Sequence, residues 1–256
     1  MKKISRIIGG FAIMIITWQL IFQFGHYNQA LFPSPQGVVK GFKELMTQGV
    51  LVDDIYDSMI RFLIGYSISV VLGITLGLIL GWFRGIWGFI NPIVQVLRPI
   101  SPMAWLPFIV LWFGIGDIPA IVIIFIAAFF PILLSTVSAV GNVDQTYLKI
   151  AKNFGIKQPQ ILTKIILPAT FPNIATGLHL ALGTAWVFLV AGEMVGAQTG
   201  LGFLIIDARN NLRADMLMAA MIVIGVLGLL LDSLIRLLEQ RIYKRWGIVA
   251  NERSAS

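Results

Sequence analysis

The sequence predicts an all-α, polytopic membrane protein that forms a single domain with six membrane-spanning helices. Of its 256 residues, 57% are hydrophobic and only 12% are charged, whereas ordinary soluble domains carry roughly 25% charged residues. The mean hydropathy is +0.87, and a soluble core of this size cannot hide so much apolar surface. The net charge of +7 is spread between the apolar runs, where basic residues orient membrane helices. We therefore expect membrane lipid, and no nucleic acid, as a partner.

Six segments approach the roughly 20 apolar residues that a membrane helix needs. They are predicted at about 7–24, 59–83, 87–113, 118–140, 173–195 and 216–238. The first follows three basic residues, as a signal peptide would, but no small-x-small cleavage site comes after it. We therefore expect this helix to be retained. After it, "LFPSPQGVVKGFKELMTQGV" predicts a proline turn and a mildly amphipathic helix along the outer surface.

Basic residues predict the orientation, because cytoplasmic loops are enriched in lysine and arginine. With the N-terminus inside, the inner segments hold Lys2, Lys3, Arg6, Arg84, Lys149, Lys152, Lys157, Lys164, Arg236, Arg241, Lys244, Arg245 and Arg253. The outer segments hold only Lys40, Lys43, Arg61, Arg209 and Arg213. We expect both termini on the cytoplasmic side, which makes residues 141–172 the main cytoplasmic loop.

Small residues recur every four positions along the second predicted span. They are Gly65, Ser69, Gly73, Gly77 and Gly81. Such a ridge lets another helix backbone approach closely. Two interpretations are open. The ridge could pack against another helix of the same bundle, or it could form an interface between two copies of the chain.

The cytoplasmic loop contains two short helical patterns separated by a glycine. Tyr147, Ile150, Ala151 and Phe154 fall on one helix face, and Gly155 is placed to end that helix. Pro159 suits the first turn of a second helix, which Pro168 and Pro172 are expected to end. The apolar face could pack back on the bundle or bind a soluble partner.

The loop resembles the permease loop of importers of the ATP-binding-cassette superfamily, whose pattern is E-A-A-x3-G-x9-I-x-L-P. Gly155, Ile165, Leu167 and Pro168 match the second half of that pattern, whereas Lys149 and Ile150 depart from its E-A start. The stretches "VLRPISPMAWLPFIVLWFG" and "AGEMVGAQTGLGFLI" are similar to the nitrate/sulfonate/taurine group of these permeases. The likeness covers nearly the whole chain.

This resemblance implies a type I importer permease in a bacterial cell membrane, with the loop as its cytoplasmic coupling helix pair. It implies three partners, which are a second copy of the chain, a cytoplasmic ATPase dimer and an extracytoplasmic solute-binding protein. ATP and Mg would be bound by the ATPase, and no cofactor or metal by this chain. By position in the motif, the ATPase contact is expected at Tyr147, Ala151, Phe154, Gly155, Ile156, Leu167 and Pro168.

A solute path is expected near the third segment, where four prolines interrupt the helix. Arg98 lies in this run, and an arginine inside a membrane is a functional hypothesis by default. Its guanidinium suits an oxyanion, and Ser101, Trp105 and Trp186 are further candidates. Alternatively, Arg98 snorkels to the inner headgroups and Trp186 is core packing. Glu193 is expected to pair with Arg209 or Arg213.

Three functional classes are compatible with so apolar a chain. An importer permease driven by a separate ATPase is favoured, because the chain has no P-loop of its own. A secondary transporter is the alternative, although no inverted repeat is visible. A membrane enzyme would need a cluster of catalytic polar residues, whereas this chain has no cysteine and two distant histidines. The expected solute is a sulfonate, taurine, nitrate or bicarbonate, with an aromatic vitamin precursor as the alternative.

Overall fold

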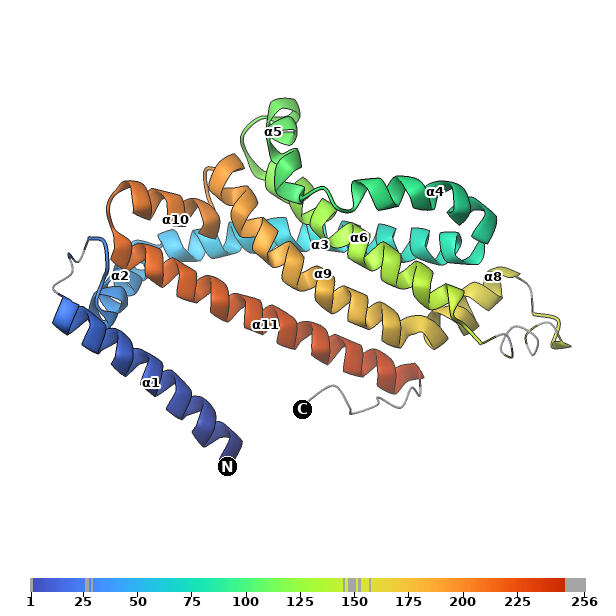
Figure 1. Cartoon of the computed structure of the whole chain (residues 1–256), viewed down its shortest axis with the longest axis horizontal. Helices are drawn as coiled ribbons and strands as arrows, with labels where there is room; N and C mark the ends of the chain where they lie inside the picture. Colours follow the sequence, from blue (N-terminus) through green and yellow to red (C-terminus); the bar gives the residue numbers. More distant parts are fainter. Residues whose placement is uncertain are drawn as a thin grey trace.

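The computed structural model describes residues 2–25, 28, 30–144, 146, 151, 153–156 and 158–246, and their regular structure is entirely helical. The elements are α1 (Lys2–Gly25), α2 (Pro35–Thr47), α3 (Val50–Trp82), α4 (Arg84–Leu97), α5 (Pro102–Phe113), α6 (Asp117–Gly141), α8 (Gln158–Ile161), the π-helical turn η1 (Leu162–Ile166), α9 (Leu167–Gly196), α10 (Leu201–Asn210) and α11 (Ala214–Trp246). The long helices lie side by side, with α2 and α10 at one end of the bundle and α8 at the other (Figure 1).

Four helices among the described residues are long and apolar enough to cross a membrane. They are Val50–Trp82, Asp117–Gly141, Leu162–Gly196 and Ala214–Trp246. A fifth span is possible if α4 and α5, which are bent by 90° relative to each other, count together. The first predicted span corresponds to α1, whose apolar part Gly9–Gly25 is shorter. The membrane class is therefore confirmed, while the count of six spans stays a prediction.

The ridge of small residues on α3 packs against α6 of the same chain. A Cβ atom added to Gly73 would lie 2.8 Å from Ile132, and one added to Gly77 would lie 2.5 Å from Thr136. Ser69 donates a hydrogen bond to the Phe125 carbonyl of α6 at 3.1 Å. In this single chain the ridge thus brings two backbones together within the bundle rather than facing outward.

Aromatic side chains join α3, α9 and α11. The rings of Phe62 and Trp186 meet edge to face with centroids 5.4 Å apart. The Trp186 indole donates to the Ile224 carbonyl of α11 at 3.1 Å, and Tyr66 donates to the Leu178 carbonyl of α9 at 2.8 Å. Each polar tip thus has a partner inside an apolar cluster.

Three predicted boundaries were wrong. The second span begins at Val50 rather than at about 59, because α3 retains acidic residues in its first turns that bind other elements. The third span is two helices, since Pro102 starts a new one. The last span before α10 begins at Leu162 and continues through Pro168 and Pro172. Pro168 falls in the first turn of α9, directly after the π-helical turn η1, and proline is tolerated in a first helical turn.

We expect Gly77→Ala to lower the free energy of unfolding by about 1–3 kcal/mol, the usual cost of overpacking, because its Cβ would meet Thr136. Gly225→Ala is the matched control, since nothing lies within 4 Å of the added Cβ. There, the gain in helix propensity predicts a stabilisation of up to about 1 kcal/mol. Thermal unfolding in detergent measures both. Equal melting temperatures would show that α3 and α6 separate easily at Gly77.

Candidate functional site

The connecting segment, defined here as residues 151–166, joins α6 to α9 at the α8 end of the bundle (Figure 1). Its apolar side chains Ala151, Ile161 and Ile166 are buried in one cluster with Val140 of α6. Trp82, at the end of α3, packs against the same cluster. Apolar contacts therefore hold the segment against the ends of two spans.

A glycine ends the first helical turn of the connecting segment. Gly155 has φ +67°, in the left-handed region that glycine adopts at no steric cost. The Ile156 amide donates to the Ala151 carbonyl at 3.1 Å, which is the backbone hydrogen bond of a Schellman helix end. This bond reverses the chain direction and leaves Phe154, the residue before the glycine, at the tip of the turn.

The predicted partner-facing residues are divided between the interior and the surface. Phe154 is 79% exposed, and the space beside Gly155 is open. Ala151, by contrast, is fully buried. Its expected direct contact with a partner was wrong, because its small side chain packs inward against α6. Tyr147 and Lys149 lie outside the described residues.

Three further predicted contact residues lie beside the buried cluster. Ile156 packs against it and is half-buried. Leu167 and Pro168 are half-buried in the first turn of α9. These side chains are therefore less available to a partner than Phe154 is.

A buried ion pair joins the spans near the α10 end. Arg61 of α3, which is 3% exposed, donates through Nη1 to Oε1 of the fully buried Glu193 of α9 at 2.7 Å. The same guanidinium lies 2.6 Å from the Asp117 carboxylate at the start of α6. It also donates to the Thr199 carbonyl at 2.7 Å. One arginine thus binds groups from three other parts of the chain.

Acidic and hydroxyl side chains around this pair accept the first amides of α10. The Gly200 amide donates to Asp54 at 2.7 Å, the Leu201 amide to Ser58 at 2.9 Å and the Gly202 amide to Glu193 at 2.9 Å. These contacts satisfy donors that a helix N-terminus leaves unpaired. The start of α10 is therefore fixed to α3 and α9.

The expected partners of Glu193 were wrong. Arg213 binds Glu44 of α2 at 2.6 Å and Asp215 at 2.9 Å, and its hydrogen bond holds the pKa of the Glu44 carboxyl below its usual value. Arg61 lies inside α3 rather than in an outer loop. The one sequence signal for the pair was an arginine within an apolar run.

A second polar group joins α9 to α11. The His179 imidazole lies 2.7 Å from Glu239 through Nε2 and 3.3 Å from Asp232 through Nδ1. Arg236 donates to Asp232 at 2.9 Å. A ring protonated on both nitrogens would donate to both carboxylates. Sequence analysis missed this group, because its members are 53 and 60 residues apart.

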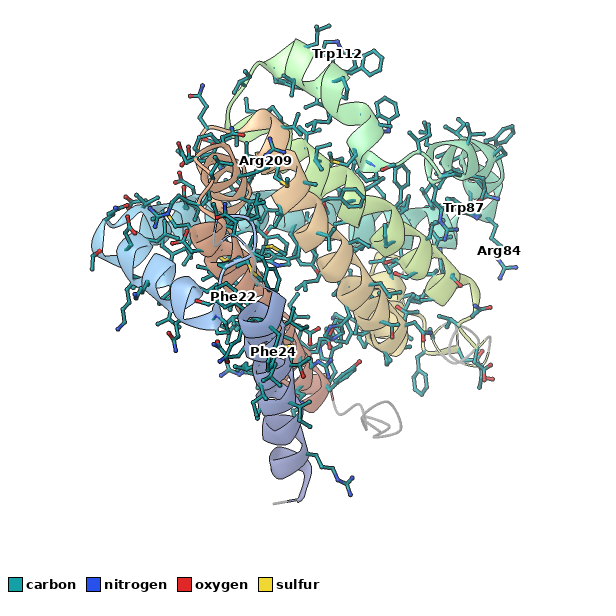
Figure 2. The ribbon with its side chains drawn as sticks, turned by 60° about the vertical axis from the view of Figure 1, so that its left-hand side comes forward. Phe22, Phe24, Arg84, Trp87, Trp112 and Arg209 are labelled. Carbon is teal, nitrogen blue, oxygen red and sulfur yellow. The ribbon has the colours of Figure 1, made fainter. Side chains whose placement is uncertain are left out.

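The predicted solute-path residues do not lie together. Arg98 and Ser101 are exposed at the bend between α4 and α5, and Trp105 is half-buried where α5 meets α6. Beyond them, Leu106 and Ile109 of α5 pack against Ile123 of α6, and Trp112 projects at the end of α5 (Figure 2). Trp186 lies in the core between α3 and α11. Assigning Trp186 to the path was wrong, because its ring and its N–H group are both occupied.

Comparison with known proteins gives consistent results. The taurine transport system permease protein TauC of Escherichia coli is 31% identical over 94% of this chain and 90% of its own length. The nitrate import permease protein NrtB of Synechocystis is 32% identical over 93% and 88%. Among solved structures, the MetNI methionine ABC transporter in an inward-facing conformation aligns with a TM-score of 0.63 at 22% identity.

The structural match covers 77% of this chain and 96% of the MetNI chain, and it confirms the importer permease fold. Because the two sequences are only 22% identical, this match is evidence for the fold and not for the function. Residues 69–244 match the family described as the binding-protein-dependent transport system inner membrane component. That stretch contains the connecting segment, the bend beside Arg98 and the residues around Glu193. The chain is a member of this family of membrane permeases.

Proposed function

We propose that the chain is the membrane-spanning subunit of an ATP-driven importer and carries a small oxyanion or a solute with an oxyanion group. Taurine contains a sulfonate group and nitrate is itself an anion, so this chemistry is common to the solutes named for TauC and NrtB. A separate ATPase dimer binds ATP and Mg, a binding protein delivers the solute, and two copies of the chain enclose the path. The α8 end faces the cytoplasm.

The observation that carries this proposal is the exposed Phe154 on a segment whose other described apolar side chains pack against the bundle. A large apolar side chain that is 79% exposed at a helix end fits a groove on a soluble partner. The Ala151, Ile161 and Ile166 side chains beneath it are buried against α3 and α6. Movement of a partner bound to Phe154 is therefore transmitted to the spans.

The path of that movement follows one continuous helix. Residues 162–196 form a single span from the connecting segment to Glu193. Glu193 binds Arg61 of α3 and the first turn of α10. Closure of the ATPase pair at one end would thus reorient the elements at the other end of the bundle, as alternating access requires.

Arg98 is proposed to bind the solute within the path. The 14 residues of α4 place it roughly 21 Å from the start of that helix, too far for an arginine side chain to reach the inner headgroups if α4 stays parallel to the long spans, as in Figure 1. Within the described part of the chain its guanidinium has no hydrogen-bond or ion-pair partner. An unpaired arginine in a membrane requires an anion or water.

We expect Phe154→Asp to abolish uptake and co-purification of the ATPase subunit, because a charge cannot enter an apolar groove without a partner. Insertion in the membrane should be unchanged, since the side chain is exposed. Phe154→Tyr and the neighbouring exposed Asn153→Ala are the matched controls and should keep both activities. Normal uptake by Phe154→Asp would disprove the coupling role.

We expect Arg98→Ala to raise KM for an anionic solute roughly tenfold or more, the loss expected for a charge-assisted hydrogen bond. Arg98→Lys should retain part of the affinity, because it keeps the charge without the bidentate geometry. Uptake kinetics in reconstituted vesicles measure this change. Wild-type kinetics for Arg98→Ala would remove Arg98 from the path.

We expect Glu193→Gln to lower the free energy of unfolding by about 3–5 kcal/mol, the usual result of breaking a buried ion pair, because it leaves the Arg61 charge buried with less compensation. The matched control is Glu44→Gln, the same substitution in the exposed pair with Arg213. That variant should melt close to the wild type. Similar melting temperatures for both variants would show that the buried pair contributes little.

A further inference from the structure

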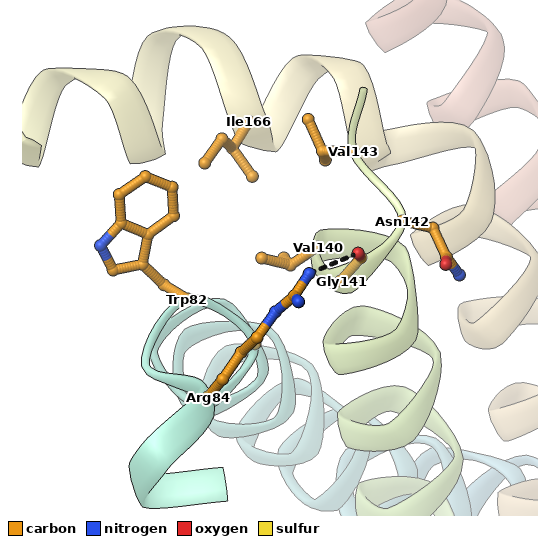
Figure 3. Close-up of a pocket in the computed structure, with 8 residues that line it drawn as sticks. Trp82, Arg84, Val140, Gly141, Asn142, Val143 and Ile166 are labelled. Carbon is orange, nitrogen blue, oxygen red and sulfur yellow. Dashed lines mark hydrogen bonds between the residues drawn. The ribbon is translucent and has the colours of Figure 1, made fainter. Parts of the chain in front are cut away.

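A pocket of about 400 Å³ opens between the ends of α3 and α6 and the connecting segment. Trp82 and Arg84 line one side, Gly141 and Asn142 the other, and Ile166 of η1 lies across from Arg84 (Figure 3). A second hollow of about 360 Å³ adjoins it and shares Arg84 and Asn142. The two form one recess at the α8 end, and the function proposed above does not use it.

The recess offers hydrogen-bond donors and no acidic side chain. Arg84 donates to the Gly141 carbonyl at 3.1 Å (Figure 3), which is its one hydrogen bond to the described part of the chain, and a guanidinium has five N–H groups. The side chains of Asn142 and Ser138 add an amide and a hydroxyl, and the Asn142 amide donates to the Ser138 hydroxyl at 3.5 Å. No aspartate or glutamate is among the residues that line either hollow. Among the described residues that line the recess, Arg84 is thus an exposed cation without a carboxylate, which favours an anion.

The surroundings of Arg84 are those of a membrane surface. Trp82 and Trp87 flank it, and Arg84 and Trp87 project together from the first turn of α4 (Figure 2). Tryptophan and arginine at the ends of spans are typical of the headgroup level. Ile79, Phe83 and Ile86, next to the recess in the chain, are exposed apolar side chains. A ligand that pairs with the Arg84 guanidinium and also covers these apolar side chains has an anionic head and an apolar tail.

We propose that the Arg84 recess binds the phosphate of an anionic phospholipid, with Arg84 and Asn142 on the phosphate and the exposed side chains of α3 and α4 along the acyl chains. Basic recesses between spans on the cytoplasmic side are suited to such headgroups. The bound lipid also touches η1, so it supports the junction between the connecting segment and the spans. The inference uses the proposed function only for the cytoplasmic orientation of this end.

The test is a titration of the delipidated full-length chain with phosphatidylglycerol or phosphatidylcholine in a nonionic detergent, followed by the melting temperature. We expect phosphatidylglycerol to stabilise the wild type more than phosphatidylcholine does. Arg84→Gln should weaken the apparent affinity for phosphatidylglycerol roughly tenfold or more. Arg241→Gln is the matched control, because Arg241 is another exposed arginine at the same end, and it should bind as the wild type does.

Asn142→Asp provides an independent test that leaves the Arg84 side chain in place. Asn142 is exposed, so the variant should fold, and the added negative charge should repel the phosphate and remove the response. Arg84→Lys, which keeps the positive charge, should retain part of the stabilisation by phosphatidylglycerol. Unchanged phosphatidylglycerol affinity in Arg84→Gln and Asn142→Asp, or an equal loss in Arg241→Gln, would overturn the proposal.

Two further measurements distinguish other occupants of the recess. Inorganic phosphate could stabilise the wild type as strongly as phosphatidylglycerol does, without stabilising Arg84→Gln. That result would overturn the lipid proposal and identify the ligand of the recess as a free anion. Loss of the ATPase subunit from Arg84→Gln with unchanged lipid affinity would assign the recess to that partner and overturn the proposal. The lipid titration needs neither ATPase nor transport, so its failure leaves the proposed function untouched.

Discussion

The arrangement of the spans depends on the buried pair of Arg61 and Glu193. Either charge alone among apolar side chains would cost several kcal/mol, so the register of α3 and α9 in which these residues meet at 2.7 Å is favoured. Asp117 adds the start of α6 to the same contact. Once this register is set, Gly73 and Gly77 lie opposite the α6 residues that fill the space a side chain would need.

The two ends of the bundle are held by different forces. At the α10 end, charged and hydroxyl groups bind at defined distances and admit little variation in geometry. At the α8 end, Ala151, Ile161 and Ile166 meet Val140 through apolar contacts, which tolerate sliding because dispersion and burial have no preferred direction. Under the proposed function the α8 end moves with a partner, which suits the second kind of contact, whereas the α10 end sets the register, which suits the first.

Much of the fold was predictable from local patterns. Apolar length predicted the long spans, and the spacing of Gly73 and Gly77 predicted a close helix contact. Contacts between distant parts of the sequence were not predictable. Arg61 and Glu193 are 132 residues apart, and no local pattern pairs them. The family motif located the connecting segment but not which side chains face outward, so Ala151 and Phe154 received the same role. Pro168 was read as a helix end because the π turn before it has no sequence signature.

The unbroken helix from Leu162 to Gly196 has a thermodynamic consequence for the two faces of the membrane. Its 35 residues span roughly 50 Å, and it begins in the connecting segment and carries the Arg61 pair near its last turn. In the importer proposed above, a rigid helix would share one equilibrium between its ends, so a ligand that favours one tilt from outside would change the nucleotide affinity of the ATPase inside by the same factor. Under that proposal, the binding protein and ATP would be reciprocal effectors, so the effect of each could be measured through the affinity for the other.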